Sequence, residues 1–485
     1  MGTIIKGLSD MLQIYHQDAE HPAVQEKHTV YTYGQFWTNV RHLCNYLERM
    51  NIRKVAVIAE QGYTIYCWLW AVYLSGGTFC CINREYPEHR IIQCLKLYRP
   101  ELTVTQISLP QEHLGCFIDP KDGVLEDIPP ILTPRINEPN EIAYILMTSG
   151  STGEPKGVRI RRDAFEEVIE SAVDIFQLSS KDCYGQFSNV SFDMGICDIF
   201  AGLSSGAILI PIKGMDRLRP ATMIGRYGIT FWYSVPTVLD IMEKRNEITE
   251  ENLHSLRAIG FGGATLYGHH VEKLFRCNGN LTIINTYGPS EITIFSSVVV
   301  MKKDTYHTYC DGSVCIGSEI ANVTQILQLV DDGLYQVIVD GNHVYDGYLN
   351  EENCDCEIRF YKNMKQFETG DLVRINNGER YFVCRNDMQT KYRGNRIDLN
   401  EIDTLIREKG IVKKVVIATD DMLVAFIESS VSDAKLREVQ SYLRKRLPKY
   451  SIPSEFIRMQ MIPCNVNGKY DRATLKKLLL ERKLT

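Results

Sequence analysis

One stretch in the N-terminal half has the residue types needed to hold a polyphosphate. It follows the apolar run 142–147 and contains Thr148, Ser149, Gly150, Ser151, Thr152, Gly153 and Lys156. Glycines let a backbone approach a ligand closely, and backbone amides, hydroxyls and an ammonium group suit phosphate oxygens. The spacing differs from a P-loop, because Lys156 is followed by Gly157 rather than by Ser or Thr. Taken alone, the stretch is explained equally well as a flexible surface loop.

Three later segments have the pattern of a buried strand that runs into a loop. The strands are expected at 229–233, 257–261 and 281–285, and the loops at 234–237, 262–264 and 286–289. In parallel α/β sheets, ligands bind beyond the carboxyl ends of the strands. We therefore expect these loops to converge with the glycine-rich stretch on one cleft.

The remaining pattern predicts an α/β protein of two domains. Helices are expected at 4–15, 33–50 and 65–74, a strand at 55–59, and a helix capped by Asp163. Short β segments at 323–329 and 335–339 indicate a β-rich subdomain at about 313–383. A strand pair (415–419, 422–427), a helix capped by Ser432 and a terminal helix from Asp471 follow. We predict a large domain at 1–386 and a mobile α+β domain at 387–485.

Composition excludes several classes of protein. The net charge of −6 argues against a nucleic-acid partner, which favours a basic surface. The longest apolar stretches, such as 66–74, are far shorter than the ~20 residues of a membrane span. Fifteen cysteines are scattered without zinc-site spacing. A reduced, cytoplasmic location is expected.

Five stretches follow one another along the chain, at 143–158, 285–291, 369–371, 385–387 with 391–398, and 467–472. In this order they resemble the motifs of the adenylate-forming superfamily, which includes acyl-CoA synthetases, luciferases and the adenylation domains of nonribosomal peptide synthesis. The resemblance covers nearly the whole chain. Within the superfamily, the chain length and Phe192-Asp193 most resemble those of stand-alone amino-acid adenylating enzymes, such as D-alanine–carrier protein ligases.

The resemblance implies a nucleotide site and a catalytic lysine. Lys469 resembles the lysine that bridges the substrate carboxylate and the α-phosphate, and Asp387 the hinge. Glu291 resembles the magnesium-linked glutamate, and Thr148 is assigned to the same ion. Tyr287 resembles the aromatic residue that stacks on adenine. The full ATP-binding set is Thr148, Ser149, Gly150, Ser151, Thr152, Gly153, Lys156, Gly263, Ala264, Asn285, Thr286, Tyr287, Gly288, Asp371, Arg385 and Lys469.

Each of these residues also has an ordinary structural explanation. Lys469 follows Asn467-Gly468, which is typical of an exposed turn. Glu291 is explained equally by a negative charge at the N-terminus of a helix, and Tyr287 is explained by a tyrosine in the protein core. Asp371 resembles the aspartate that accepts both ribose hydroxyls, but it also suits a turn after Gly370. Arg385 resembles the ribose-contacting arginine, although Cys384 replaces the glycine that usually precedes it.

The resemblance also implies an amino-acid pocket. Asp193 stands where amino-acid adenylating members have the aspartate that pairs with the substrate ammonium, although it would equally cap the following helix. A small or medium side chain is expected. D-alanine ligases usually have cysteine where Gly262 stands, which counts against D-alanine. The pocket set is Asp193, Met194, Cys197, Tyr233, Gly260, Gly262, Thr286, Ile294 and Phe295.

Three functions remain open at this point. The first is activation of an amino acid by ATP and Mg²⁺ to aminoacyl-AMP, with transfer to the phosphopantetheine thiol of a separate carrier protein. The second is an acyl- or aryl-CoA ligase, against which the charge of Asp193 argues. The third is a catalytically inactive binding protein, against which Lys469, Glu291 and Asp371 argue.

Overall fold

Two compact units make up the chain in the computed structural model. One consists of Met1–Arg84, Tyr98–Met147 and Gly157–Cys384, and the other of Glu85–Leu97, Thr148–Lys156 and Arg385–Thr485. The structure describes residues 18–109, 116–118, 142–149, 155–331, 333–349, 359–361, 364–386, 389–411, 414–419, 422–463 and 470–482.

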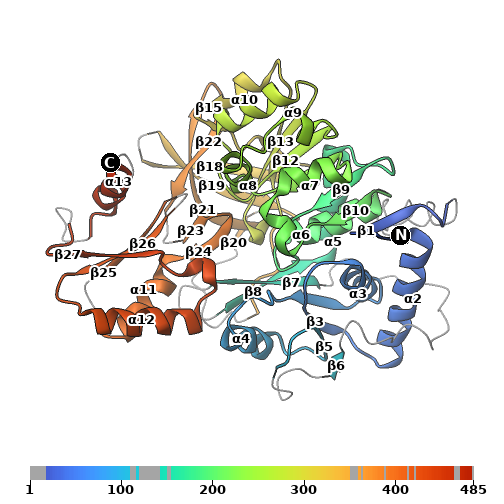
Figure 1. Ribbon diagram of the computed structural model, residues 1–485, viewed down its shortest axis with the longest axis horizontal. Helices are drawn as coiled ribbons and strands as arrows, with labels where there is room; N and C mark the ends of the chain where they lie inside the picture. Colours follow the sequence, from blue (N-terminus) through green and yellow to red (C-terminus); the bar gives the residue numbers. More distant parts are fainter. Residues whose placement is uncertain are drawn as a thin grey trace. The chain divides into compact units, whose positions relative to one another are not determined.

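A nine-stranded sheet, counted over the described residues, is the largest element of the first unit (Figure 1). Its strand order is β17-β14-β13-β12-β11-β9-β10-β1-β2. Strands β11, β12 and β13 are adjacent and parallel, so their carboxyl ends lie at one edge. The bounds are β1 Pro22–Glu26, β2 Thr29–Thr32, β9 Cys183–Gln186, β10 Ile208–Pro211, β11 Phe231–Ser234, β12 Ala258–Phe261, β13 Thr282–Tyr287, β14 Ser297–Met301 and β17 Ser318–Glu319.

A second sheet has the order β6-β5-β3-β4-β7-β8 within the described ranges. The pairs β3–β4, β3–β5, β4–β7 and β5–β6 are parallel, and β3 and β7 are almost entirely apolar and buried, as expected for a sheet covered on both faces. The bounds are β3 Lys54–Ile58, β4 Thr78–Cys81, β5 Leu102–Thr105, β6 Cys116–Ile118, β7 Ile142–Ser149 and β8 Pro155–Arg161.

Helices α2, α3, α5 and α6 contribute to one core that contains side chains of both sheets (Figure 1). Phe200 is central to it, because its ring contacts Trp70, Tyr73, Phe79 and Phe165 at centroid distances of 4.5, 5.3, 5.9 and 5.0 Å. Every residue of α6 except the first is buried, which explains its apolar sequence. The bounds are α2 Tyr33–Arg49, α3 Tyr63–Leu74, α5 Arg162–Phe176 and α6 Asp193–Ser204.

A second core covers the other face of the nine-stranded sheet. There Trp232, Ile259 and Ile283 of three adjacent strands pack with Leu239 of α8 and Val271 of α10. The helices are η2 Gly214–Leu218, α7 Pro220–Tyr227, α8 Thr237–Lys244, α9 Glu250–Leu253, α10 Gly268–Cys277, η3 Ser290–Ile292 and η4 Tyr306–Tyr309.

The predicted β-rich subdomain is a sheet of the order β18-β19-β21-β20, to which β22 is added by pairing with β21. The pairs β18–β19, β19–β21 and β20–β21 are antiparallel, and β21 contains Asp371. The bounds are β18 Val323–Asp331, β19 Leu334–Gly341, β20 Arg359–Tyr361, β21 Met364–Asn376 and β22 Glu379–Arg385. β15 Cys310–Asp311 and β16 Ser313–Val314 form a separate antiparallel pair.

The second unit is smaller and combines helices with short sheets. Arg90 of α4 and Glu401 of α11 form a buried ion pair of 3.1 Å inside it. The elements are α4 Glu88–Tyr98, β23 Gln389–Tyr392, β24 Asn395–Asp398, α11 Leu399–Glu408, β25 Lys414–Ala418, β26 Leu423–Glu428, α12 Asp433–Arg446, η6 Lys449–Ser451, β27 Glu455–Met459 and α13 Arg472–Arg482.

The predicted fold class, α/β layers with a β-rich subdomain and a smaller α+β C-terminal part, is confirmed. Ser432 caps α12 as expected, because its hydroxyl accepts the N–H of Lys435 at 3.2 Å. The cap predicted at Asp163 is wrong. α5 begins at Arg162, and Asp163 lies in its first turn, where the Arg161 guanidinium binds its carboxylate at 2.9 Å. The helix predicted at 4–15 lies outside the described residues.

None of the helices in the described parts of the chain combines the length and the apolar character needed to cross a membrane.

Candidate functional site

The ends of β11, β12 and β13 bring together residues that are far apart in the sequence. Tyr233 pairs in register with Gly260, which in turn pairs with Ile284. The residues that follow on each strand, including Gly262 and Thr286, therefore lie at the same edge of the sheet. This is the edge at which parallel sheets bind ligands.

A hydrogen bond between Tyr233 and Thr286 crosses this edge. The Tyr233 hydroxyl lies 2.7 Å from Thr286 Oγ1, which also donates to the Phe261 carbonyl at 3.1 Å. Burial raises the pKa of Tyr233 well above its usual value, so its hydroxyl stays protonated. The ring is held from behind by Phe176, at a centroid distance of 5.1 Å. The Tyr233 ring therefore forms one wall of the predicted pocket, and its hydroxyl is an uncharged polar group there.

Gly262 leaves room for this hydrogen bond. A Cβ atom built on Gly262 would lie 2.5 Å from Thr286 Oγ1 and 2.9 Å from the Tyr233 hydroxyl. Both distances are shorter than any normal carbon–oxygen contact. Any side chain at position 262 must therefore break the Tyr233–Thr286 bond or displace the loop.

We predict that Gly262→Ala is destabilising by about 1–3 kcal/mol, the usual cost of overpacking. Chemical unfolding of the two proteins measures the difference. Gly225→Ala is the matched control, because a Cβ there would meet Asn252 only at an ordinary 3.4 Å, and alanine is favoured within helix α7. Equal free energies of unfolding for the two variants would contradict the steric argument.

Asp193 is the first residue of α6 and is tied to a loop that is distant in sequence. Its Oδ2 accepts the Ser290 hydroxyl at 2.7 Å, and its Oδ1 accepts the backbone N–H of Met194 at 2.8 Å. Burial chiefly raises the pKa values of Tyr233 and Cys197, and the negative charges of Asp198 and Asp193 add to the increase. The N-cap of α6 is Phe192, so Asp193 does not cap the helix in the usual position.

The other predicted pocket residues belong to α6 and to the segment that follows η3. Met194 approaches the loop after β12, since its sulfur lies 3.4 Å from a Cβ built on Gly263. Cys197 is buried one turn further along α6. Ile294 and Phe295 are buried after η3, and Phe295 lies 6.2 Å from Phe176 between ring centroids.

The chain at Thr293 and Ile294 has a strained backbone. Their φ angles are 51° and 73°, a left-handed conformation that is unfavourable for β-branched residues. The Thr293 hydroxyl donates to the His343 carbonyl at 2.8 Å and helps to hold this conformation. Such strain is concentrated at functional sites.

Two predicted nucleotide residues meet directly. The Tyr287 hydroxyl donates to Asp371 Oδ2 at 2.7 Å, and both side chains are buried. Thr369 holds the backbone of Asp371, because its Oγ1 accepts the Asp371 N–H at 3.0 Å and donates to the Val337 carbonyl at 2.7 Å. Thr369 belongs to a recognised motif but was not predicted as a site residue.

Asn285 has an unused acceptor at this edge. Its Nδ2 donates to the Cys315 carbonyl at 2.9 Å, while its buried Oδ1 has no hydrogen-bond partner among the described residues. A buried amide oxygen without a donor is costly, so the position favours a ligand that carries an N–H group. The amino group of adenine is such a donor.

Glu291 is almost completely buried in η3, with an exposed fraction of 1%. Its Oε1 accepts the Tyr348 hydroxyl at 2.9 Å, and its backbone carbonyl accepts the Tyr345 N–H at 2.8 Å. Tyr348 was missed because it stands in no recognised motif. A carboxylate of this kind offers the oxygen ligands that Mg²⁺ prefers.

Several predicted residues are not brought into this arrangement by the described structure. Gly150, Ser151, Thr152, Gly153, Asp387 and Lys469 lie outside the described residues, as does the side chain of Ser149. Thr148, near the end of β7, is half-buried, and Lys156, on β8, is buried. Arg385 ends β22 and is half-buried. Gly263, Ala264 and Gly288 lie in the loops after β12 and β13.

Curated relatives match most of the chain at low identity. Zwittermicin A synthase ZmaJ of Bacillus cereus is 28% identical over 450 residues, covering 87% of this chain and 85% of the relative. The D-alanine–D-alanyl carrier protein ligase of Staphylococcus aureus is 25% identical over 481 residues, covering 95% and 97%. Gramicidin S synthase 2 of Brevibacillus brevis is 28% identical over 94% of this chain, but the chain spans only 11% of that protein.

Solved adenylation domains share the fold. The Vibrio cholerae adenylation domain AlmE, in complex with glycyl-adenosine-5'-phosphate, has a TM-score of 0.83 at 23% identity and covers 99% of each chain. Holo-PA1221, which contains adenylation and PCP domains, has a TM-score of 0.81 at 20% identity and covers 97% and 84%. A family model described as AMP-binding enzyme matches residues 13–349. The chain therefore belongs to the AMP-binding enzyme family, and the resemblance to the adenylate-forming superfamily is confirmed.

Proposed function

We propose that this adenylate-forming enzyme activates an amino acid with ATP and then transfers the acyl group to a carrier protein. In the first step a carboxylate oxygen of the amino acid attacks the α-phosphorus, and pyrophosphate leaves. In the second step a phosphopantetheine thiol attacks the acyl carbon, and AMP leaves. The carrier is proposed to be a separate chain.

The observation that carries the amino-acid assignment is the position of Asp193. Its carboxylate accepts a hydrogen bond from Ser290, which precedes Glu291 in η3. The ammonium group of an amino acid is a suitable partner for a carboxylate that is held in this way, since a hydrogen bond between two charged groups is strong. The curated relatives named D-alanine–D-alanyl carrier protein ligase and gramicidin S synthase 2 support this proposal.

The nucleotide assignment uses the residues already described. Asp371, held by Tyr287 and Thr369, would accept ribose hydroxyls, and Asn285 Oδ1 would accept the adenine amino group. Glu291 and Thr148 would hold Mg²⁺, which when bound neutralises charge on the phosphates. Holding the reacting groups in line is the main task of the protein, since it contributes little covalent chemistry.

The C-terminal part is proposed to complete the site. Residues 387–485 would form a mobile domain with its hinge at Asp387, and Lys469 would bridge the substrate carboxylate and the α-phosphate. Gly394, which follows Lys391 in a turn with a φ of 77°, would face the site in the thioester-forming state. Hinges of this kind are a few residues that absorb large changes in φ and ψ.

The side chain that is activated is proposed to be small or medium. Tyr233 and Phe295 fill one end of the pocket, and both are buried. At Gly262 the space is already taken by the Tyr233–Thr286 hydrogen bond, so this glycine does not enlarge the pocket.

Amino-acid-dependent exchange between ATP and pyrophosphate tests the function. The panel would contain all common L- and D-amino acids together with aryl and fatty acids. We expect exchange with one or a few amino acids of small or medium side chain. Exchange only with amine-free acids would establish the acyl- or aryl-CoA ligase instead, and no exchange from folded protein with Mg²⁺ would favour an inactive homologue. Loading of a phosphopantetheinylated carrier then tests the second step.

A further inference from the structure

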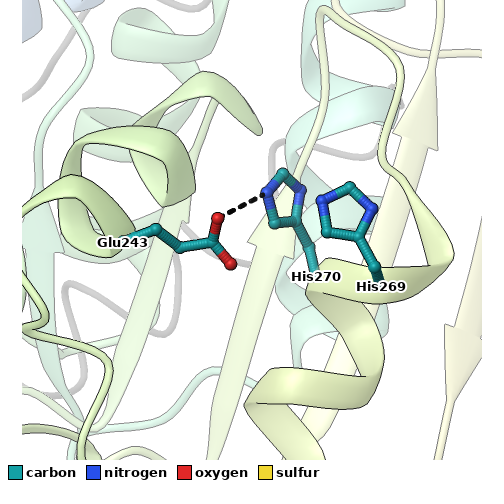
Figure 2. A group of neighbouring side chains, drawn as sticks. All are labelled: Glu243, His269 and His270. Atoms are coloured by element: carbon teal, nitrogen blue, oxygen red, sulfur yellow. Dashed lines mark ion pairs between the residues drawn. The ribbon is translucent and has the colours of Figure 1, made fainter. Parts of the chain in front are cut away.

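Four potential metal ligands gather between α8 and α10, on the side of the sheet covered by the second core. Figure 2 shows Glu243 of α8 facing His270 of α10, with His269 beside it. His270 Nε2 lies 3.7 Å from Glu243 Oε2 and 3.4 Å from Asp240 Oδ1. Ligand atoms of Glu243, His269 and His270 all lie within 4.8 Å of one another.

His270 is the unusual member of the group. Its side chain is only 4% exposed, yet neither ring nitrogen has a hydrogen-bond partner within the described part of the chain. Burying an imidazole without such partners is costly, and native proteins rarely do so without a compensating ligand or water. The ring points at the carboxylates of α8, so a bound group would lie between the two helices.

We propose that Asp240, Glu243, His269 and His270 bind one divalent transition-metal ion of the zinc class and thereby cross-link α8 to α10. Imidazole nitrogens combined with carboxylates suit Zn²⁺, Co²⁺ and Ni²⁺, whereas Mg²⁺ and Ca²⁺ prefer sets of oxygen ligands. The site is therefore distinct in its chemistry from the magnesium site proposed at Glu291.

The present distances are close to those of a metal site. In a tetrahedral site with bonds of about 2.1 Å, neighbouring ligand atoms lie about 3.4 Å apart. The ligand atoms of Glu243, His269 and His270 lie within 4.8 Å of one another, so side-chain rotations that move each atom by about 1–1.5 Å would bring these three to one ion. Lys273 does not block it, because its Nζ binds Glu243 Oε1 at 3.2 Å and leaves Oε2 facing His270. His269 is exposed and gives the ion a path from solvent.

The cross-link would join helices that follow two strands of the candidate site. α8 follows β11 and Tyr233, and α10 follows the loop that begins at Gly262. An ion that binds the folded state and not the unfolded chain raises stability by mass action. We therefore expect the metal to raise the melting temperature of the whole chain.

Metal titration of the full chain tests the proposal. After treatment with a chelator, Zn²⁺ is titrated in competition with a chromophoric chelator, and Co²⁺ is used as a spectroscopic probe. We expect one ion per chain and a cobalt spectrum without thiolate charge-transfer bands, since the ligands are nitrogen and oxygen. His269→Gln, at an exposed position, should weaken binding at least about tenfold, a loss at the lower end of that caused by disturbing metal-site residues.

Control variants distinguish metal binding at this site from binding to cysteines and from loss of the folded structure. His28→Gln alters another exposed histidine and should leave affinity unchanged. Glu243→Gln should weaken binding as His269→Gln does, and both variants should retain the metal-free melting temperature to within a few degrees. Absence of stoichiometric binding, thiolate bands in the cobalt spectrum, or full affinity in both variants would each overturn the proposal.

Discussion

Replacing Lys469 by alanine is expected to lower the rate of adenylate formation by about 10²–10³-fold, the usual cost of removing one group that stabilises transition-state charge. In the proposed mechanism its ammonium group contacts the substrate carboxylate and the α-phosphate as charge develops between them. ATP is held mainly by other residues, so its affinity should change little. Pyrophosphate exchange measures the rate, and calorimetry measures ATP binding.

Lys477→Ala is the matched control for this variant. Lys477 lies on α13 with a side chain that is 78% exposed and 3.9 Å from Glu481, a pair that contributes little to stability. Exchange at the normal rate in this variant would show that loss of a C-terminal lysine is harmless in general. Near-normal exchange in Lys469→Ala would remove Lys469 from the mechanism.

Replacing Asp193 by alanine is expected to weaken the use of the amino acid by about 2–5 kcal/mol, which corresponds to about 30-fold or more in kcat/KM. Truncation of one partner in a desolvated charge pair has this effect, because the substrate ammonium loses its counterion. The KM for ATP should change little. The measurement is exchange at varied concentrations of each substrate.

Ser290→Ala tests whether Asp193 binds the amino acid or only anchors the loop that contains Glu291. Ser290 donates one hydrogen bond to Asp193, so its loss should cost only about 0.5–1.5 kcal/mol. If Asp193 acts mainly by anchoring the loop of Glu291, the two variants should impair ATP and amino acid alike. That result would contradict the assignment of Asp193 to the ammonium group.

The elements with strong periodicity were predictable from the sequence. The helix expected at 33–50 is α2, Tyr33–Arg49, and its start is fixed by a capping box between Thr32 and Gln35. The three strand-then-loop segments are β11, β12 and β13, adjacent as expected. Their pattern is reliable because a parallel strand buried on both faces is continuously apolar.

The start of α5 shows why local signals fail. Asp163 is a good N-cap residue in isolation, but its carboxylate binds Arg161, and the helix starts two residues earlier, with Arg161 at the N-cap. A side chain that finds a partner across the turn no longer has to satisfy the helix backbone. Such competition between local and neighbouring partners is not visible in propensities.

In the candidate site, the motif residues were predictable and their supports were not. Tyr287, Glu291 and Asp371 stand in recognisable stretches, whereas Tyr348 supports Glu291 from a position 57 residues away. A lone tyrosine in a β-rich segment has no periodic or motif signal. Its role depends on tertiary contact alone, and sequence analysis of a single chain cannot supply that.

The crowding at Gly262 makes the order of amino-acid replacements matter. As long as the Tyr233 hydroxyl and Thr286 Oγ1 occupy the space above it, a cysteine or alanine at position 262 is penalised. A smaller residue at position 233 would remove that penalty and deepen the pocket at the same time. In descendants of this chain, replacement of Tyr233 by a smaller residue is therefore expected to precede replacement of Gly262 by a residue with a side chain. Specificity would then evolve through these two replacements in one order only.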